Sequence, residues 1–203
     1  MDLSKVEKLY TENIEKFGID SRSVGWNSPE SQNLRFSKLL EMVTDPETPF
    51  SINEVGCGYG ELYKYMLTHA YAVNKFTGYD ISDKMLENAR IYLGNDSRVD
   101  LRKAAAIDTE ADYSATSGIF NVKFDEQADR WEDYIKEMIL NMHRFSRKGF
   151  SFNLLTSYVD FHAPDLYYAD PAVFFDFCKR ECSKKVALLH DYPLYEWTII
   201  VRK

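Results

Sequence analysis

The 203-residue chain is predicted to be an α/β protein, a doubly wound sheet of about seven strands with helices on both faces. Three observations predict this fold. Short β-prone runs alternate with longer stretches of helical periodicity, the pattern of a mostly parallel sheet. The first of these runs ends in a glycine-rich turn that leads directly into a helical stretch. Two strand-like runs close the chain with only a short turn between them, which predicts one antiparallel strand.

The first 45 residues are expected to form two helices ahead of the sheet. Apolar residues recur at helical spacing over Leu3–Phe17, and Gly18 is typical of a helix end. Ser28 is a typical N-cap, with Pro29 at the first helical position of the second helix. The apolar stripe of the first helix predicts that it covers either the sheet or the mouth of a site.

The later elements follow from the same patterns of periodicity and turn residues. Helices are expected after Ser82, over Asp125–Arg147 and from Asp170-Pro171 onward. The strands expected after the second one are short runs rich in apolar or β-branched residues, and they are Val99–Lys103, Ala111–Phe120 with its following loop, Phe150–Leu155, Val186–Leu189 and Glu196–Val201.

The stretch from Ser51 to Leu62 is the first that indicates a function. Its glycines alternate at Gly56, Gly58 and Gly60, where a strand turns into a helix. Glycine allows positive φ and a close approach of a ligand to the main chain, and a helix start supplies unpaired N–H groups. A dinucleotide fingerprint would have its third glycine at position 61, and a P-loop would contain G-K-[ST]; neither is present. Glu54 opens the loop instead and suits a cationic or amino-bearing ligand.

Three segments, in order along the chain, resemble the class I S-adenosylmethionine-dependent methyltransferases, and in particular their small bacterial members. Glu54–Gly60 (EVGCGYG) resembles motif I, (D/E)-x-G-x-G-x-G. Phe76–Ser82 (FTGYDIS) is similar to the second strand with its terminal acid, and Ala111–Phe120 to the fourth strand and its loop. The resemblance implies a Rossmann-like sheet with strand order 3-2-1-4-5-7-6 and S-adenosylmethionine as cofactor. It also implies one methyltransferase domain over residues 1–203, whose N-terminal helices, residues 1–45, cap the cofactor site.

The resemblance also assigns cofactor contacts. The acid at the end of the second strand, here Asp80, would accept hydrogen bonds from the ribose hydroxyls. Arg35 either pairs with the methionine carboxylate or lies on a solvated helix face. The family's usual acid for the adenine amino group is replaced by Ala104–Ala106, which leaves Asp108 as the nearest candidate. The full set expected at the cofactor is Trp26, Gln32, Arg35, Glu54, Gly56, Gly58, Gly60, Asp80, Ile81, Met85, Asp108 and Ser117.

No motif identifies the acceptor site, but topology narrows its position. Ligands bind at the carboxyl ends of parallel strands, and that edge should receive Asn121, Tyr158–Tyr168 and His190–Tyr192. His162 or His190 would then take the proton from an acceptor hydroxyl. The alternative is that the aromatic segment packs onto the body and that both histidines are structural. The residues expected to bind the acceptor are Asn121, Tyr158, Tyr167, Tyr168 and Tyr192.

Composition limits the class of partner. A net charge of −7 argues against a nucleic acid bound by a broad basic face. The chain has no apolar run long enough for a membrane span or a leader, and its three cysteines fit a reducing compartment, so a cytoplasmic protein is expected. Cys178 and Cys182, one helical turn apart, have no neighbouring ligands, so no metal site is expected.

The sequence therefore predicts a methyltransferase that acts on a polar small molecule. The family resemblance favours a hydroxyl group on a sugar-like metabolite. Two alternatives stay open. A methyltransferase acting on RNA or protein would have a basic rim and an open cleft. A non-catalytic module that binds S-adenosylmethionine would leave no room for an acceptor.

Overall fold

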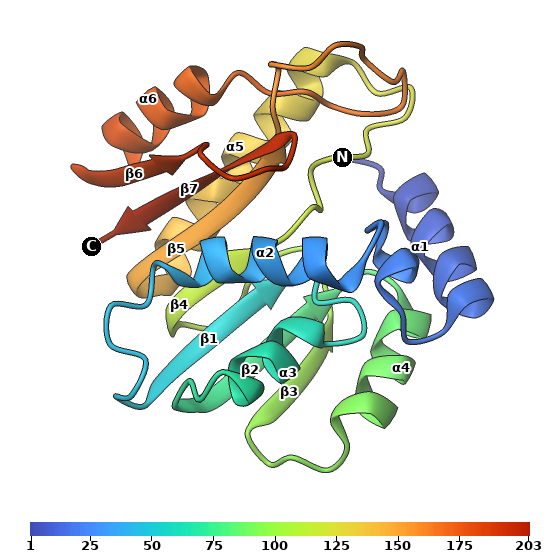
Figure 1. Ribbon diagram of the computed structural model, residues 1–203, viewed down its shortest axis with the longest axis vertical. Helices are drawn as coiled ribbons and strands as arrows, with labels where there is room; N and C mark the ends of the chain where they lie inside the picture. Colours follow the sequence, from blue (N-terminus) through green and yellow to red (C-terminus); the bar gives the residue numbers. More distant parts are fainter.

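Seven strands form one sheet in the order β3-β2-β1-β4-β5-β7-β6, in a computed structural model that describes all 203 residues (Figure 1). β7 pairs antiparallel with both β5 and β6, and the other pairings are parallel. The predicted fold class, with its single antiparallel strand, is confirmed. The strands are β1 Phe50–Val55, β2 Val73–Asp80, β3 Val99–Lys103, β4 Ala111–Thr116, β5 Ser146–Leu155, β6 Lys185–Leu189 and β7 Glu196–Arg202.

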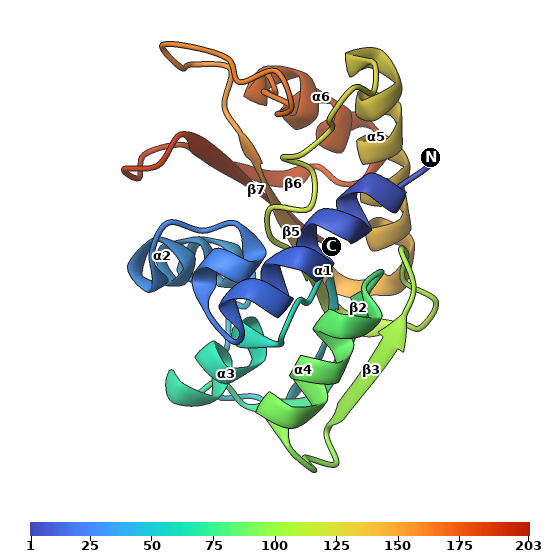
Figure 2. The ribbon, with the colours of Figure 1, turned by 90° about the vertical axis from the view of Figure 1, so that its right-hand side faces the viewer.

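Helices cover both faces of the sheet. Figures 1 and 2 show α2 and α3 on one face and α5 and α6 on the other. α4 joins the first layer, because its Leu86 and Leu93 belong to the same hydrophobic cluster as Phe36 of α2 and Leu62 of α3. The helices are α1 Ser4–Phe17, α2 Pro29–Leu40, α3 Glu61–Thr68, α4 Asp83–Leu93, α5 Ala128–Phe145 and α6 Pro171–Glu181, with a 3-10 turn, η1, at Ser21–Val24.

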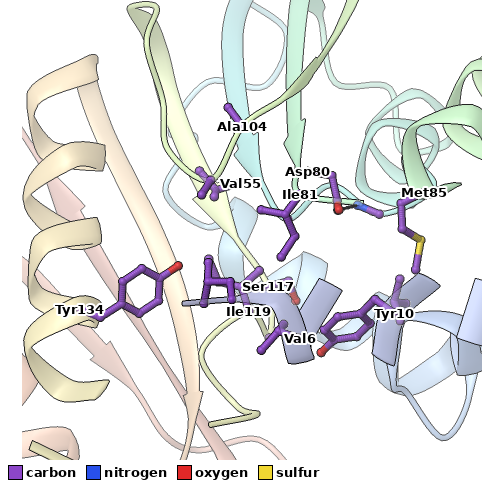
Figure 3. Close-up of a pocket in the computed structure, with 16 residues that line it drawn as sticks. Val6, Tyr10, Val55, Asp80, Ile81, Met85, Ala104, Ser117, Ile119 and Tyr134 are labelled. Carbon is purple, nitrogen blue, oxygen red and sulfur yellow. Dashed lines mark hydrogen bonds between the residues drawn. The ribbon is translucent and has the colours of Figure 1, made fainter. Parts of the chain in front are cut away.

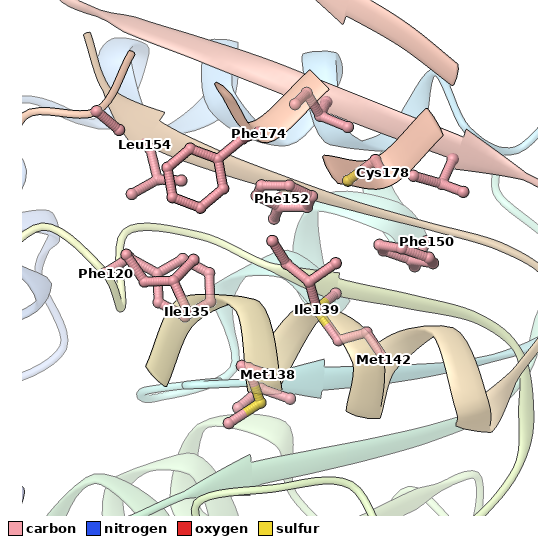
Figure 4. Packing of buried hydrophobic residues seen from close by; sticks show 14 of the residues in the cluster. Phe120, Ile135, Met138, Ile139, Met142, Phe150, Phe152, Leu154, Phe174 and Cys178 are labelled. Carbon is pink, nitrogen blue, oxygen red and sulfur yellow. The ribbon is translucent and has the colours of Figure 1, made fainter. Parts of the chain in front are cut away.

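The second hydrophobic cluster lies between the sheet and the helices α5 and α6. Ile135, Ile139 and Met142 of α5 face Phe150 and Phe152 of β5 (Figure 4). All five side chains are fully buried, and burial of this kind is the main source of stability. The apolar stripe of α5 is therefore core over most of its length.

The boundary between α5 and β5 differs from the prediction. The helix was expected to reach Arg147 and the strand to begin at Phe150, but α5 ends at Phe145 and β5 begins at Ser146. The buried Ser146 hydroxyl accounts for the early start, because it donates to the carbonyl of Met142 and shares a hydrogen bond with the Ser114 hydroxyl of β4. A polar residue that is satisfied inside the fold gives no apolar signal in the sequence.

α1 stands apart from both layers and lies beside the carboxyl ends of the strands (Figure 2). Its Thr11 hydroxyl and the Ser82 hydroxyl at the start of α4 are 2.8 Å apart and share a hydrogen bond. Glu7 is 3.6 Å from the ammonium of Lys103 at the end of β3. These contacts hold α1 over the edge of the sheet where a ligand would bind. None of the helices is both long and apolar enough to cross a membrane.

Candidate active site

The glycine loop, Gly56–Gly60, connects β1 to α3 and has the geometry that its sequence predicts. Gly56 and Gly58 have φ of 71° and 53°, in the left-handed region that favours glycine. A Cβ atom on Gly56 would lie 2.1 Å from the Cγ2 atom of Ile119, and one on Gly58 would lie 2.8 Å from Cγ1 of Val24. The loop therefore presents bare main chain, and side chains from two other segments touch it.

Asp80, at the end of β2, fastens this loop. Its Oδ2 accepts from the Gly58 N–H and its Oδ1 from the Ser82 N–H, each at 2.9 Å. Burial raises the pKa of Asp80 to about 6, although the backbone N–H groups oppose the shift. Each carboxylate oxygen can accept a second hydrogen bond, and Asp80 lines the cavity described next. The carboxylate can therefore hold the loop and a ligand at the same time.

A cavity lies between the glycine loop, α1 and the loop after β4, Ser117–Gln127 (Figure 3). It is lined mainly by apolar side chains, with Asp80 at one end and Tyr134 at the other in Figure 3. The predicted cofactor residues that line it are Gly56, Gly58, Asp80, Ile81, Met85 and Ser117.

The lining residues that sequence reasoning did not assign to the cofactor include four from the helices α1 and α5. Leu3, Val6 and Tyr10 come from α1, so the apolar stripe of that helix does cover a site. Tyr134 comes from α5. Burial raises the pKa of both tyrosines to about 12, so their hydroxyls stay protonated. The spacing of the α1 stripe could have indicated its role. Tyr134 could not have been found, because it is adjacent to the core position Ile135.

A smaller cavity shares Gly56 and Ser117 with the first and is also lined by Trp26, Gln32 and Glu54. The Glu54 Oε2 and Ser117 Oγ atoms are buried without a hydrogen-bond partner. Burial, followed by the nearby Asp80 charge, raises the pKa of Glu54 well above its usual range. A lone buried acceptor of this kind is costly unless a ligand satisfies it. The cavity thus fits the amino-bearing end of a ligand.

The other predicted cofactor residues lie outside both cavities. Arg35 is buried rather than solvated, and its guanidinium donates two hydrogen bonds of 2.8 Å to the Glu196 carboxylate of β7. Asp108 accepts from the Tyr79 hydroxyl at 2.8 Å and from Arg102 at 2.6 Å. Gly60 is the N-cap residue of α3 and lines neither cavity.

Three segments that were expected at the acceptor site are neighbours in the fold. They are the loop after β4, the aromatic loop Thr156–Asp170 and the turn His190–Tyr195, and together they are called the acceptor edge. Val122 of the first segment forms a β-bridge with Leu166 of the second. The rings of Tyr158 and His190 lie 5.8 Å apart, which joins the second segment to the third. The three segments therefore meet above the sheet.

Side chains of the acceptor edge fall into two groups. Asn121, Tyr167 and Tyr192 are buried, and the two tyrosine hydroxyls bond to Glu132 and Thr198.

The second group is open to solvent. Tyr158 is 70% exposed, and both His162 and His190 are exposed. The His162 ring stacks on Tyr168 at 4.5 Å. Neither group lines the two cavities.

Comparisons with known proteins agree with this geometry. The profile of a protein family described as "Methyltransferase domain" matches residues 52–149. A protein of Mycobacterium tuberculosis named "Putative methyltransferase Rv1506c" is 47% identical over 163 residues, which make up 79% of this chain and 98% of that protein.

Solved structures show the same fold. Magnesium protoporphyrin IX methyltransferase (ChlM) from Synechocystis PCC 6803 with bound SAH superposes with a TM-score of 0.69 at 12% identity, and all of both chains is covered. The DhpI–SAH complex superposes with a TM-score of 0.67 at 11% identity, over 97% of this chain and 94% of that one. The chain therefore belongs to the methyltransferase family, and it is an S-adenosylmethionine-dependent methyltransferase.

Proposed function

We propose that this methyltransferase acts on a hydroxyl group of an uncharged, polar, sugar-like small molecule. When bound, S-adenosylmethionine supplies a methyl group on a sulfonium sulfur, which an aligned acceptor oxygen can displace. The protein must hold the cofactor, place the acceptor in line with that methyl group and take up the hydroxyl proton.

Residues that line the two cavities can bind the cofactor. Asp80 has free lone pairs for the ribose hydroxyls, and the apolar Ile81 and Met85 line the same space. Glu54 Oε2 is the unpaired acceptor for an ammonium group, next to Ser117. Gln32 accepts from the Tyr59 hydroxyl through Oε1, so its amide N–H groups remain available for a carboxylate.

The N-terminal segment, residues 1–45, is proposed to be the cap over this site within one domain spanning residues 1–203. α1 closes one wall of the larger cavity, and Trp26 and Gln32 close one wall of the smaller. At its start, Lys5 forms an ion pair with Asp125 at 2.6 Å, and both side chains are largely exposed. Exposed pairs contribute about 0–1 kcal/mol, so this contact by itself holds the start of α1 only weakly.

The charge of the acceptor edge is the observation that carries the proposed acceptor class. Lys123 is its only cationic side chain, and its ammonium donates to the carbonyls of Phe124 and Glu126 in its own turn. The exposed aromatics Tyr158 and Phe161 offer apolar faces to a hydroxyl-rich molecule. The acids along the same segments are Asp125, Glu126, Asp160, Asp165, Asp170 and Asp191.

This charge pattern disfavours anionic acceptors. Phosphate and nucleic-acid ligands are held by free Lys and Arg side chains, often bidentate, and this edge offers none. The RNA-methylating alternative would need the basic rim that is missing here. A neutral acceptor would not be repelled by the acidic side chains.

Labelled cofactor tests the acceptor class directly. We expect extracts fractionated by ion exchange to incorporate radiolabelled methyl groups in the neutral small-molecule fraction. Incorporation confined to the anionic, RNA or protein fractions would contradict the proposal. Mass spectrometry of the labelled compound would then identify the methylated atom.

The proton acceptor is proposed to be His162 or His190. Once an acceptor is in hand, His162→Ala or His190→Ala should lose roughly 10²–10⁴-fold in turnover, with cofactor affinity unchanged. His69→Ala is the matched control, because His69 lies at the far end of α3 and stacks on Tyr65. Parental turnover in both edge variants would rule out a histidine base.

A further inference from the structure

A buried ionic cluster lies behind the loop after β4 and lines neither cavity. Its centre is the ion pair of Arg35 on α2 and Glu196 on β7, whose side chains are 10% and 1% exposed. Asn153 of β5 adds a third donor, from Nδ2 to Glu196 Oε2 at 2.9 Å. The Arg35 Nη1 also donates to the carbonyl of Ser31 at 2.9 Å. One helix of the N-terminal segment is thus joined to two strands of the sheet.

The cluster reaches Gly118 from two directions. Asn153 Oδ1 accepts a hydrogen bond from the Gly118 N–H at 2.9 Å. The Trp26 ring lies 3.8 Å from the Arg35 guanidinium, and a Cβ atom on Gly118 would lie 2.4 Å from that ring. Gly118, whose φ is 76°, thus lies between the indole ring of Trp26 and the side-chain amide of Asn153.

Gly118 is the centre of a wall of the site. Ser117 before it lines both cavities, and Ile119 after it touches Gly56 of the glycine loop. A small shift of the Gly118 main chain would move both neighbours. Because the residues around the two cavities are closely packed, such a shift would change the shape of the cofactor site.

We propose that Arg35 and Glu196 are positioning residues, which fix the stretch Ser117–Ile119 against the cofactor by orienting Trp26 and Asn153. The proposal rests on the proposed function in one respect, that the two cavities hold the cofactor. In this proposal Arg35 orients the loop after β4 and does not bind the methionine carboxylate. It also gives the N-terminal segment a buried bidentate contact with β7 of the sheet.

The buried charges favour this role over a purely stabilising one. A buried ion pair usually adds little stability compared with apolar side chains of similar size, because desolvation offsets the attraction. What a bidentate Arg–carboxylate pair adds is fixed orientation. Here both carboxylate oxygens are paired, since Arg35 and Asn153 together donate three hydrogen bonds to them.

The test compares an apolar replacement of the pair with a control pair. The double variant Arg35→Met/Glu196→Leu should keep a thermal midpoint close to that of the parent. Its affinity for S-adenosylhomocysteine, measured by calorimetry, should fall about 5- to 20-fold. Hydrogen exchange of the Gly118 amide should become faster than in the parent. Lys84→Gln/Glu87→Gln, which removes an exposed ion pair on α4, should change none of these quantities.

A second variant keeps the test decisive if the first does not fold. Glu196→Gln retains the shape but leaves Arg35 without a charged partner, and it should weaken S-adenosylhomocysteine binding and speed Gly118 exchange in the same direction. Parental affinity and parental Gly118 exchange in a folded variant would overturn the proposal, whatever the midpoint. If the parent itself did not bind S-adenosylhomocysteine, the cofactor assignment would fail instead.

Discussion

The two sides of the ligand edge are built in different ways. On the cofactor side, main-chain geometry defines the site: the glycine loop bends through positive φ, and Asp80 holds it by accepting backbone N–H groups. On the acceptor edge, side chains on long connections define the surface, and several, such as Tyr158 and His190, are exposed. The difference indicates that the cofactor side is formed before a ligand binds, and it supports the proposal that acceptor specificity resides at the acceptor edge.

A side chain on the glycine loop should have the largest effect on the cofactor side. In Gly56→Ala the new Cβ would meet Ile119, and the left-handed backbone costs about 1–2 kcal/mol in addition. We expect S-adenosylhomocysteine affinity, measured by calorimetry, to fall by about 100-fold or more.

Gly18→Ala separates backbone strain from obstruction. Gly18 also has a positive φ, 65°, but a Cβ there would meet nothing within 4 Å. This variant should lose stability and keep its affinity for S-adenosylhomocysteine. Equal losses of affinity in the two variants would show that strain alone matters and that the cofactor side is not a preformed surface.

Lowering the pH should have the next largest effect on affinity for S-adenosylhomocysteine, through protonation of Asp80. Its carboxylate must be ionised to accept two main-chain N–H groups together with ribose hydroxyls, and its pKa is raised to about 6 by burial. Affinity for S-adenosylhomocysteine should therefore fall as the pH drops through 6, by up to about tenfold per pH unit. Asp80→Asn should bind more weakly at pH 7 and show a shallower pH dependence. A pH profile identical to that of the parent would remove Asp80 from ligand binding.

The same contrast explains how much could be predicted from the sequence. The glycine loop and the position of Asp80 at a strand end were predictable because they follow from local patterns of residues close together in the chain. The strand order was predictable from the family resemblance. The pairing of Arg35 with Glu196 was not, since the two are 161 residues apart and neither shows a pattern of its own. Tyr134 could not be predicted either, because no sequence pattern indicates which residue of an amphipathic helix extends beyond the core into a cavity.

On the acceptor edge, sequence reasoning placed three segments at one edge of the sheet but could not orient their side chains. Tyr167 and Tyr192 have hydroxyls bonded within the protein, to Glu132 and to Thr198. Those partners come from other elements, so the sequence of the aromatic loop alone could not indicate them.

Hydrogen exchange with and without S-adenosylhomocysteine tests most directly whether the two sides respond differently to the cofactor. We expect α1, Trp26–Arg35 and Ser117–Ile119 to exchange at least about tenfold more slowly in the complex, because the cap closes on a preformed cofactor side. Tyr158–Tyr168 and His190–Tyr192 should exchange at the same rate in both states, since no acceptor is bound. Unchanged exchange of the N-terminal segment, or protection confined to the acceptor edge, would contradict the account.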